Sequence, residues 1–186
     1  MSIDTPPQPT IVPGRSCEDC AMCCYMLKID ALDKPGGQWC QHCPTKKSCG
    51  IHGQHPQECR DFLCGYLTVA SLDEAWKPSK SKIIMAAELD GQRMTAIVDP
   101  ARPDAWRKAP YYDQLKSWAE AAAHYNGQVV VRIGQRYWVI LPDRDVDLGE
   151  VSDDEVIVTE ITQTPTGKTL NALKLPRTDP RAAGLA

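Results

Sequence analysis

Short alternating runs of hydrophobic and polar residues fill the second half of the chain. Such a run is typical of a half-buried β-strand, and two runs around a Gly-containing turn predict a hairpin. The turns are Asp90-Gly91, Gly134-Gln135 and Thr166-Gly167. The runs that flank them are residues 83–88 with 93–99, 129–133 with 137–141, and 156–162 with 169–175. We therefore expect three antiparallel hairpins.

One longer segment has the period of an amphipathic helix. It begins at Pro110 and ends at Asn126-Gly127, where Gly127 suits the left-handed conformation that terminates helices. Its apolar stripe is Tyr111, Leu115, Trp118, Ala122 and Tyr125. Together the hairpins and this helix predict an α+β domain over residues 82–175, in which antiparallel hairpins pack against one main helix. We expect Trp106, Trp118 and Trp138 to fill its core.

The first half of the chain shows little periodicity and divides by composition. Residues 1–15 hold four prolines and predict a disordered leader. Residues 16–66 form a small Cys-rich module with short helical turns expected at 21–27 and 56–63. Residues 67–81 are a connector with a short helix around 73–76, and residues 176–186 are a tail.

Composition excludes several classes of protein. The 186 residues carry a formal net charge of −3 and 42% hydrophobic residues, which are ordinary values for a soluble globular protein. No run approaches the ~20 apolar residues of a membrane span, so we expect no membrane contact. The slight acidity disfavours a nucleic-acid partner. The first residues lack the basic and apolar regions of a secretion signal, so we expect a cytoplasmic protein.

The cysteines are the abnormal feature. All nine lie between residues 17 and 64, so they have a local role. In a reducing cytoplasm, dense cysteines are more often metal ligands or redox groups than disulfides. A disulfide framework and a set of buried thiols are the alternatives, but the odd count disfavours the first and the repeated two-residue gaps disfavour the second. The candidate metal ligands are Cys17, Cys20, Cys23, Cys24, Cys40, Cys43, Cys49, Cys59, Cys64 and His52.

Their spacing leaves two kinds of metal centre open. Gaps of two residues let a pair of thiolates bind one zinc ion, and nearby imidazoles also favour zinc. The triple run at Cys17, Cys20 and Cys23 equally suits three ligands of a 4Fe–4S cluster. Because Cys23 and Cys24 are adjacent, their side chains should diverge toward different edges of the site.

Other residues in the same window could complete the site. Cys49-Gly-Ile-His52 adds an imidazole at three-residue spacing, and His42 and His55 lie close in sequence. Bound thiolates leave an excess of negative charge that needs nearby cations. We expect that role for Arg60, which follows Cys59, as a cofactor-binding residue, and for Lys46 and Lys47.

At these residues the chain resembles the YkgJ-type cysteine-cluster family, which is described as a zinc- or iron-chelating domain. The opening Cys-x-x-Cys-x-x-Cys-Cys matches residues 17–24, and Cys59-Arg60-Asp61-Phe62-Leu63-Cys64 matches the family's closing motif. The chain departs from the pattern at His52, where Tyr is usual, and at His55, where Arg is usual. The resemblance implies a metal-binding module. A more distant similarity to the cysteines of flagellin lysine methylases implies an iron–sulfur cluster.

Three functions follow from this pattern. The first is a metal-binding protein that holds zinc or an iron–sulfur cluster. The second is an iron–sulfur redox or protein-modifying enzyme, which needs a substrate pocket where the module meets the α+β domain. The third is a zinc-dependent adaptor for a protein partner. We found no catalytic motif in residues 82–175, where we interpret His124 as a packing or solvent residue and Asp143, Asp145 and Asp147 as a polar turn.

Overall fold

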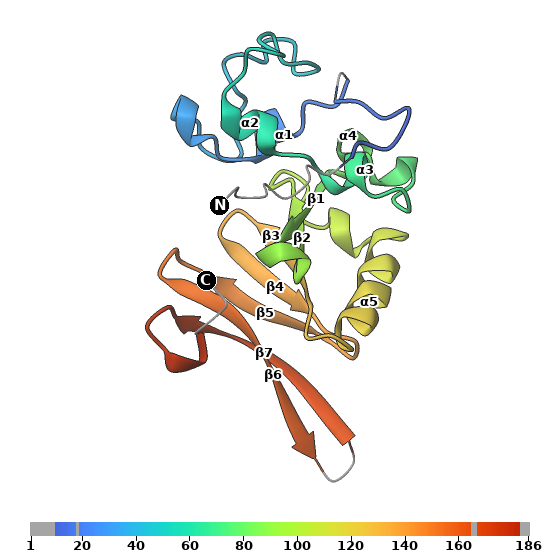
Figure 1. Ribbon diagram of the computed structural model, residues 1–186, viewed down its shortest axis with the longest axis vertical. Helices are drawn as coiled ribbons and strands as arrows, with labels where there is room; N and C mark the ends of the chain where they lie inside the picture. The colour runs from blue at the N-terminus through green and yellow to red at the C-terminus, as the bar shows by residue number, and fades with distance from the viewer. Residues whose placement is uncertain (1–9, 18, 165–166, 183–186) are drawn as a thin grey trace, which may run out of the picture.

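A mixed five-stranded sheet forms the centre of the protein. In the computed structural model, which describes residues 10–17, 19–164 and 167–182, its strand order is β1-β2-β3-β4-β5. Figure 1 shows the cysteine segment (residues 16–66) at one end of this sheet and the separate β6–β7 hairpin at the other. The expected α+β class is confirmed.

The strands are long and the helices short, apart from α5. The strands are β1 (Ile83–Glu88), β2 (Arg93–Val98), β3 (Gln128–Ile133), β4 (Arg136–Ile140), β5 (Asp145–Glu150), β6 (Glu155–Thr164) and β7 (Gly167–Pro176). The α-helices are α1 (Cys23–Met26), α2 (Gln57–Asp61), α3 (Gly65–Thr68), α4 (Pro78–Ser81) and α5 (Tyr111–Ala122). Single 3₁₀ turns are η1 (Asp30–Leu32), η2 (Glu74–Trp76), η3 (Leu89–Gly91), η4 (Ala105–Arg107) and η5 (Pro180–Ala182).

The three expected hairpins are confirmed by antiparallel pairing of β1 with β2, β3 with β4 and β6 with β7. The expectation that the domain is built from antiparallel hairpins alone is wrong, because β2 and β3 pair in parallel. A parallel pair needs a crossover, and α5 lies within it. Residues 165–166, in the third predicted turn, lie outside the described residues.

The predicted polar turn at residues 143–147 is wrong as well, because Asp145 and Asp147 belong to strand β5. Strand β5 pairs only with β4 and is therefore an edge strand of the five-stranded sheet. Charged side chains such as these carboxylates are common on edge strands. The Asp145 carboxylate accepts hydrogen bonds from the Tyr112 hydroxyl at 3.1 and 3.2 Å. It also lies 3.5 Å from the Lys116 ammonium, so it fastens β5 to α5.

Helix α5 is shorter than predicted. It ends at Ala122, so Tyr125 is not part of its buried stripe and is 64% exposed. The left-handed residue after the helix is Asn126, with φ of 57°, and not Gly127. Asn is the other residue that accepts this conformation readily.

The two faces of the sheet have different partners. On one face, Met85, Val98 and Val131 pack in the core with α5 and the three predicted tryptophans. The opposite face is shared. Ile84 and Ile97, which lie opposite each other on β1 and β2, pack against the cysteine segment, whereas Val130 and its neighbours pack against the β6–β7 hairpin. This division places the cysteine segment directly on the first hairpin.

The chain ahead of the cysteines is attached to the same region. The Val12 amide donates to the Leu67 carbonyl at 2.8 Å. The Arg15 guanidinium donates to backbone carbonyls that follow α3, at 2.9 Å for Val69 and 2.6 Å for Leu72, and also to Tyr66. Residues 1–9 of the predicted leader lie outside the described residues, and no helix in the described ranges is both long and apolar enough to cross a membrane.

We predict that Arg15→Met lowers the free energy of unfolding by about 2 kcal/mol, because several carbonyls lose a charged donor. Urea denaturation measures the change. Arg102→Met, at an exposed loop position, is the matched control and should stay within about 0.5 kcal/mol of the parent. Equal stability of the two variants would show that the Arg15 contacts contribute nothing.

Candidate metal centre

The first cysteines are placed by a tight turn and a single turn of helix. The Cys20 amide donates to the Cys17 carbonyl at 3.2 Å, and Ala21 then adopts a left-handed φ of 49° that redirects the chain into α1. Cys23 packs with the Ile84 side of the sheet, whereas Cys24 packs with the group that contains Cys40. The adjacent cysteines therefore lie in different clusters, as their order in the chain predicts.

A second loop joins the first through the backbone. The Cys40 amide donates to the Cys24 carbonyl at 2.9 Å, and the Cys43 amide donates to the Cys40 carbonyl at 3.0 Å. Cys43 is only 2% exposed. Further on, the His52 amide donates to the Cys49 carbonyl at 3.3 Å. Backbone turns thus bend the chain between Cys17 and Cys20, between Cys40 and Cys43, and between Cys49 and His52.

The last two cysteines come from the short helices. Cys59 is in α2, and Cys64 is the residue before α3. The carboxylate of Glu58 accepts from the amides of Asp30 and Ala31, both at 3.2 Å, and this contact fixes α2 against η1. After α2 the chain brings Cys64 back to Cys20 and Cys23, with which it packs.

The sulfurs fall into two neighbouring groups that share one centre. In the first group, besides burial, Cys64 and Cys20 raise the pKa of Cys17, and Cys20 raises that of Cys64. The second group is Cys40, Cys43, Cys49 and Cys59. Besides burial, Cys24 raises the pKa of Cys17 in the first group and those of Cys43, Cys49 and Cys59 in the second. Cys24 is therefore the link between the groups.

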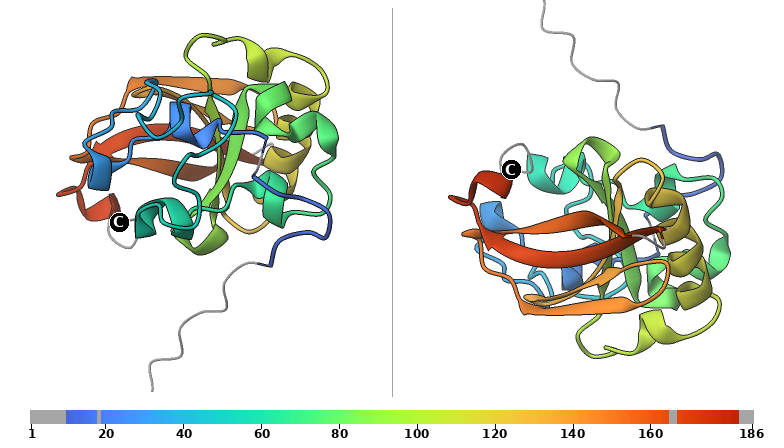
Figure 2. Two further views of the ribbon diagram at one scale, coloured as in Figure 1. Left: turned by 90° about the horizontal axis from the view of Figure 1, so that it is seen from above. Right: turned by 90° about the horizontal axis from the view of Figure 1, so that it is seen from below.

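A cavity of about 930 Å³ lies between these groups and the sheet. Eight of the nine cysteines line it, all but Cys43, and so do His42, His52 and His55. Its far wall comes from the other part of the chain: Ile84 and Ile97 of the first hairpin, and Arg132, Gly134 and Gln135 at the β3–β4 turn. In the view from above in Figure 2, the cysteine segment spreads over that end of the sheet.

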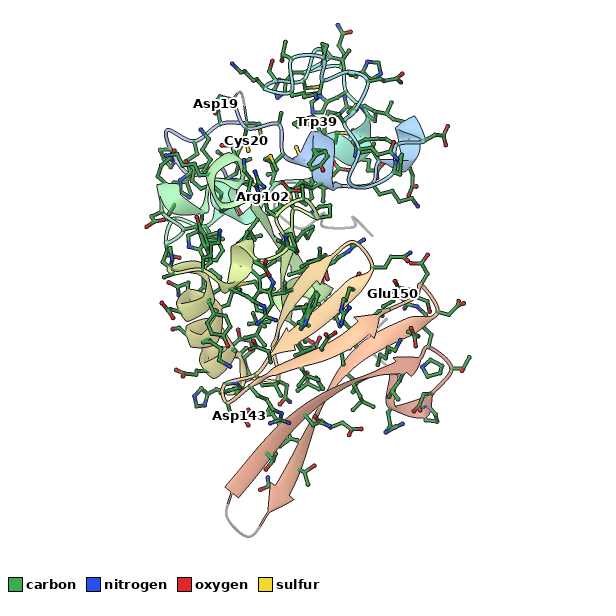
Figure 3. The ribbon with its side chains drawn as sticks, turned by 180° about the vertical axis from the view of Figure 1, so that it is seen from behind. Asp19, Cys20, Trp39, Arg102, Asp143 and Glu150 are labelled. Carbon is green, nitrogen blue, oxygen red and sulfur yellow. The ribbon has the colours of Figure 1, made fainter. Side chains whose placement is uncertain are left out.

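Figure 3 labels Cys20 and Trp39 at the end of the molecule away from Asp143. Trp39 stacks on Tyr25 with ring centroids 5.0 Å apart, and it packs with the Cys40 cluster. Asp19, which precedes Cys20, pairs with Lys77 at 2.7 Å. Aromatic packing and this ion pair therefore support the loops from outside the cavity.

Burial and the proximity of other thiols raise the pKa of six of the cysteines, which disfavours their thiolate forms while no metal is bound. Burial, followed by the neighbouring Cys64 and Cys20, raises the pKa of Cys17 to about 11. The hydrogen bond with Cys23, followed by burial, raises the pKa of Cys24 still further. Burial is also the main cause of the raised pKa values of Cys43, Cys49, Cys59 and Cys64. Metal binding would displace these protons, because the thiolate is the ligand.

The donors surround a space without converging on one point. Within residues 10–17, 19–164 and 167–182, no group of three His, Cys, Asp or Glu side chains is arranged to hold a metal ion. Zinc needs sulfur at ~2.3 Å, so the thiols would have to rotate inward. The donor set nevertheless fits a thiophilic metal in type and number. A loaded site would be closed by the same cysteines and one or more of the three histidines.

The histidines differ in their surroundings. His52, the predicted imidazole ligand, is exposed at the cavity edge, and its ring stacks on that of His55 with centroids 5.1 Å apart. The Gly53 amide donates to His55 Nδ1 at 3.0 Å. Burial and the neighbouring His52 lower the pKa of His55, which keeps its imidazole neutral at physiological pH.

The structure brings a different cation to the sulfurs from those that the sequence suggested. Arg60 is exposed and donates to the Gln57 side chain at 2.7 and 3.1 Å. Lys46 lies 5.8 Å from the Trp39 ring centroid, and Lys47 is exposed. Lys34 is the buried cation among the cysteines. Sequence reasoning missed it because a lysine in an Asp-Lys-Pro-Gly-Gly stretch has the pattern of an exposed turn.

In comparisons with protein-family models, curated proteins and solved structures, none matches this chain. The resemblance of its cysteine pattern to the YkgJ-type family therefore stays a prediction.

We predict that Cys17 in the metal-free protein reacts with iodoacetamide roughly 200-fold more slowly at pH 8 than in the unfolded chain. With a pKa of about 11, only ~0.1% of the thiol is ionised at pH 8, against about a quarter for a thiol of ordinary pKa. Because the pKa is raised, the rate should increase about tenfold per pH unit until pH 11. Peptide mass spectrometry follows Cys17 directly, and equal rates in native and denatured protein would contradict the prediction.

Proposed function

We propose that the protein binds a metal centre through its cysteine array, as zinc or as an iron–sulfur cluster, in a reducing cytoplasm. The observation that carries the proposal is that eight cysteines from separate loops line one cavity. Thiols gain little from such an arrangement by themselves, because neighbouring thiolates repel and burial disfavours the charged form. A bound cation changes this balance by pairing with the thiolates.

The grouping of the thiols is compatible with either kind of metal centre. Cys17, Cys20 and Cys64 form one group, and Cys23 packs in the same cluster as Cys20 and Cys64. The thiols of Cys40, Cys43, Cys49 and Cys59 form the other group, and His52 and His55 line the same cavity. Two four-ligand zinc sites that share Cys24, or one cluster with additional ligands, are both consistent with these groups. A zinc centre would stabilise the fold without open positions, whereas a cluster would also carry electrons.

Purification under oxygen-free conditions, followed by elemental analysis and absorption spectroscopy, distinguishes these centres. Zinc gives a colourless protein with stoichiometric metal. A 4Fe–4S cluster gives a brown protein with iron, acid-labile sulfide and absorption near ~400 nm. A folded protein that takes up neither metal, with all thiols free, would refute the proposal.

The cavity favours a second candidate function, an iron–sulfur redox or protein-modifying enzyme. Its volume of about 930 Å³ lies in the range of ligand-binding pockets and far exceeds the space that one ion needs. Its sheet wall and Arg132 come from outside the cysteine segment. If this function holds, the loaded centre should keep an open coordination position. Adding cyanide to the metal-loaded protein should then change its absorption, and an unchanged spectrum opposes the enzyme.

We predict that Cys24→Ser reduces metal content more than Cys17→Ser does, because Cys24 links the two sulfur groups and Cys17 belongs to only one of them. Each lost ligand also weakens folding that is coupled to metal binding, so the melting temperature of the loaded protein should fall. Elemental analysis and thermal denaturation measure both effects.

His124→Ala is the control for these variants. His124 is exposed beyond the end of α5 and does not line the cavity, so metal content and melting should match the parent. Full metal content in Cys24→Ser would exclude a linking role for that thiol.

A further inference from the structure

Lys34 lies inside the cysteine segment. Among the residues that the structure describes, it is the only lysine or arginine in the buried class, at 7% exposure. Its backbone is fixed by a two-way bridge with Ile29, in which the two amide-to-carbonyl distances are 2.9 and 3.0 Å. The side chain therefore has a defined position under the loops.

Three backbone carbonyls hold the ammonium group. Lys34 Nζ donates to the carbonyls of Tyr25 at 3.3 Å and Pro35 at 3.0 Å, and also to Leu27. An ammonium group has three donors, so its hydrogen bonds are complete. These carbonyls supply no formal charge, and none of the ion pairs between described residues includes Lys34.

The ammonium lies beside the first cysteines, because the Tyr25 carbonyl that it binds follows Cys24 directly in α1. The groups that favour the charged form of Lys34 are four cysteines, namely Cys40, Cys24, Cys23 and Cys59. Burial lowers the pKa of Lys34, and these sulfurs oppose that effect. A buried ammonium without an anionic partner is destabilising, so the arrangement makes physical sense when the neighbouring sulfurs carry negative charge.

We propose that Lys34 is the internal counter-cation of the metal centre and stabilises the bound thiolates of the surrounding cysteines. The inference rests on the proposed metal-binding function. A four-thiolate zinc site has a net charge of about −2, so a fixed ammonium beside it offsets part of the excess. Lys34 is a positioning residue in this scheme, because its own donors go to the backbone and not to the metal.

Zinc affinity tests the inference. We expect Lys34→Met and Lys34→Gln each to bind Zn²⁺ about 10- to 100-fold more weakly than the parent, the usual effect of removing a group that supports metal ligands. Competition with a chromophoric chelator measures the affinity in reduced, initially metal-free protein. Lys34→Arg keeps the charge and should stay nearer the parent. Lys80→Met is the matched control, because Lys80 is an exposed lysine that pairs with Glu74 and does not line the cavity, so the zinc affinity of this variant should not change.

A purely structural role would give a different pattern. If Lys34 only caps the carbonyls that follow α1, the variants should lose stability equally with and without zinc, at unchanged zinc affinity. Lys34→Gln, which keeps N–H donors, should then be more stable than Lys34→Met. The counter-cation role predicts that Gln and Met bind zinc equally weakly and that the loss of stability is larger in the zinc-bound protein.

The outcomes separate the two proposals. A parent protein that takes up neither zinc nor iron refutes the proposed function. A parent that binds zinc, with Lys34→Met and Lys34→Gln of equal affinity to it, overturns the role of Lys34 alone. If Lys34→Met does not fold, Lys34→Gln against Lys34→Arg provides the same comparison, and equal affinities there also overturn it.

Discussion

The contact between the Ile84–Ile97 pair and the cysteine segment is the constraint on which the arrangement of the thiols depends. The two side chains lie opposite each other on β1 and β2, are almost completely buried, and pack with Met22 and Met26 around α1. The helices and 3₁₀ turns of the cysteine segment are each five residues or fewer. Such short elements cannot build a core of their own, so the sheet provides the surface on which their loops are held.

Electrostatics then determines what these loops can do. Cys24 lies where the sulfur groups meet, and its neighbours make ionisation costly while no cation is bound. The close approach of these thiols becomes favourable once a divalent ion or a cluster compensates the charge of their thiolates. The buried ammonium of Lys34 fits that balance, because it adds positive charge at a place that is largely shielded from water. Under the proposed function, protonation, metal binding and folding are coupled in this part of the chain.

The fold was predictable where the determining interactions are local. Turn residues define the hairpins, and the period of α5 defines its buried face. The parallel pairing of β2 with β3 could not be predicted from the sequence of either strand, because it depends on a crossover that contains α5. Likewise, the aspartates of β5 give its sequence the pattern of a polar turn. The Tyr112 hydroxyl that binds Asp145 comes from α5, which is distant in sequence. At the site, spacing identified the cysteines, but the position of Lys34 depends on contacts that no spacing encodes.

The order of the chain has a consequence for biosynthesis. The cysteines end at residue 64, whereas Ile84 and Ile97, on which they pack, come later. During translation the thiols leave the ribosome before their supporting surface exists, since chains emerge from the N-terminus. The nascent protein must therefore pass through a stage in which all nine cysteines lack the sheet wall of their cavity. Under the proposed function, a metal delivered at that stage would meet an unformed site.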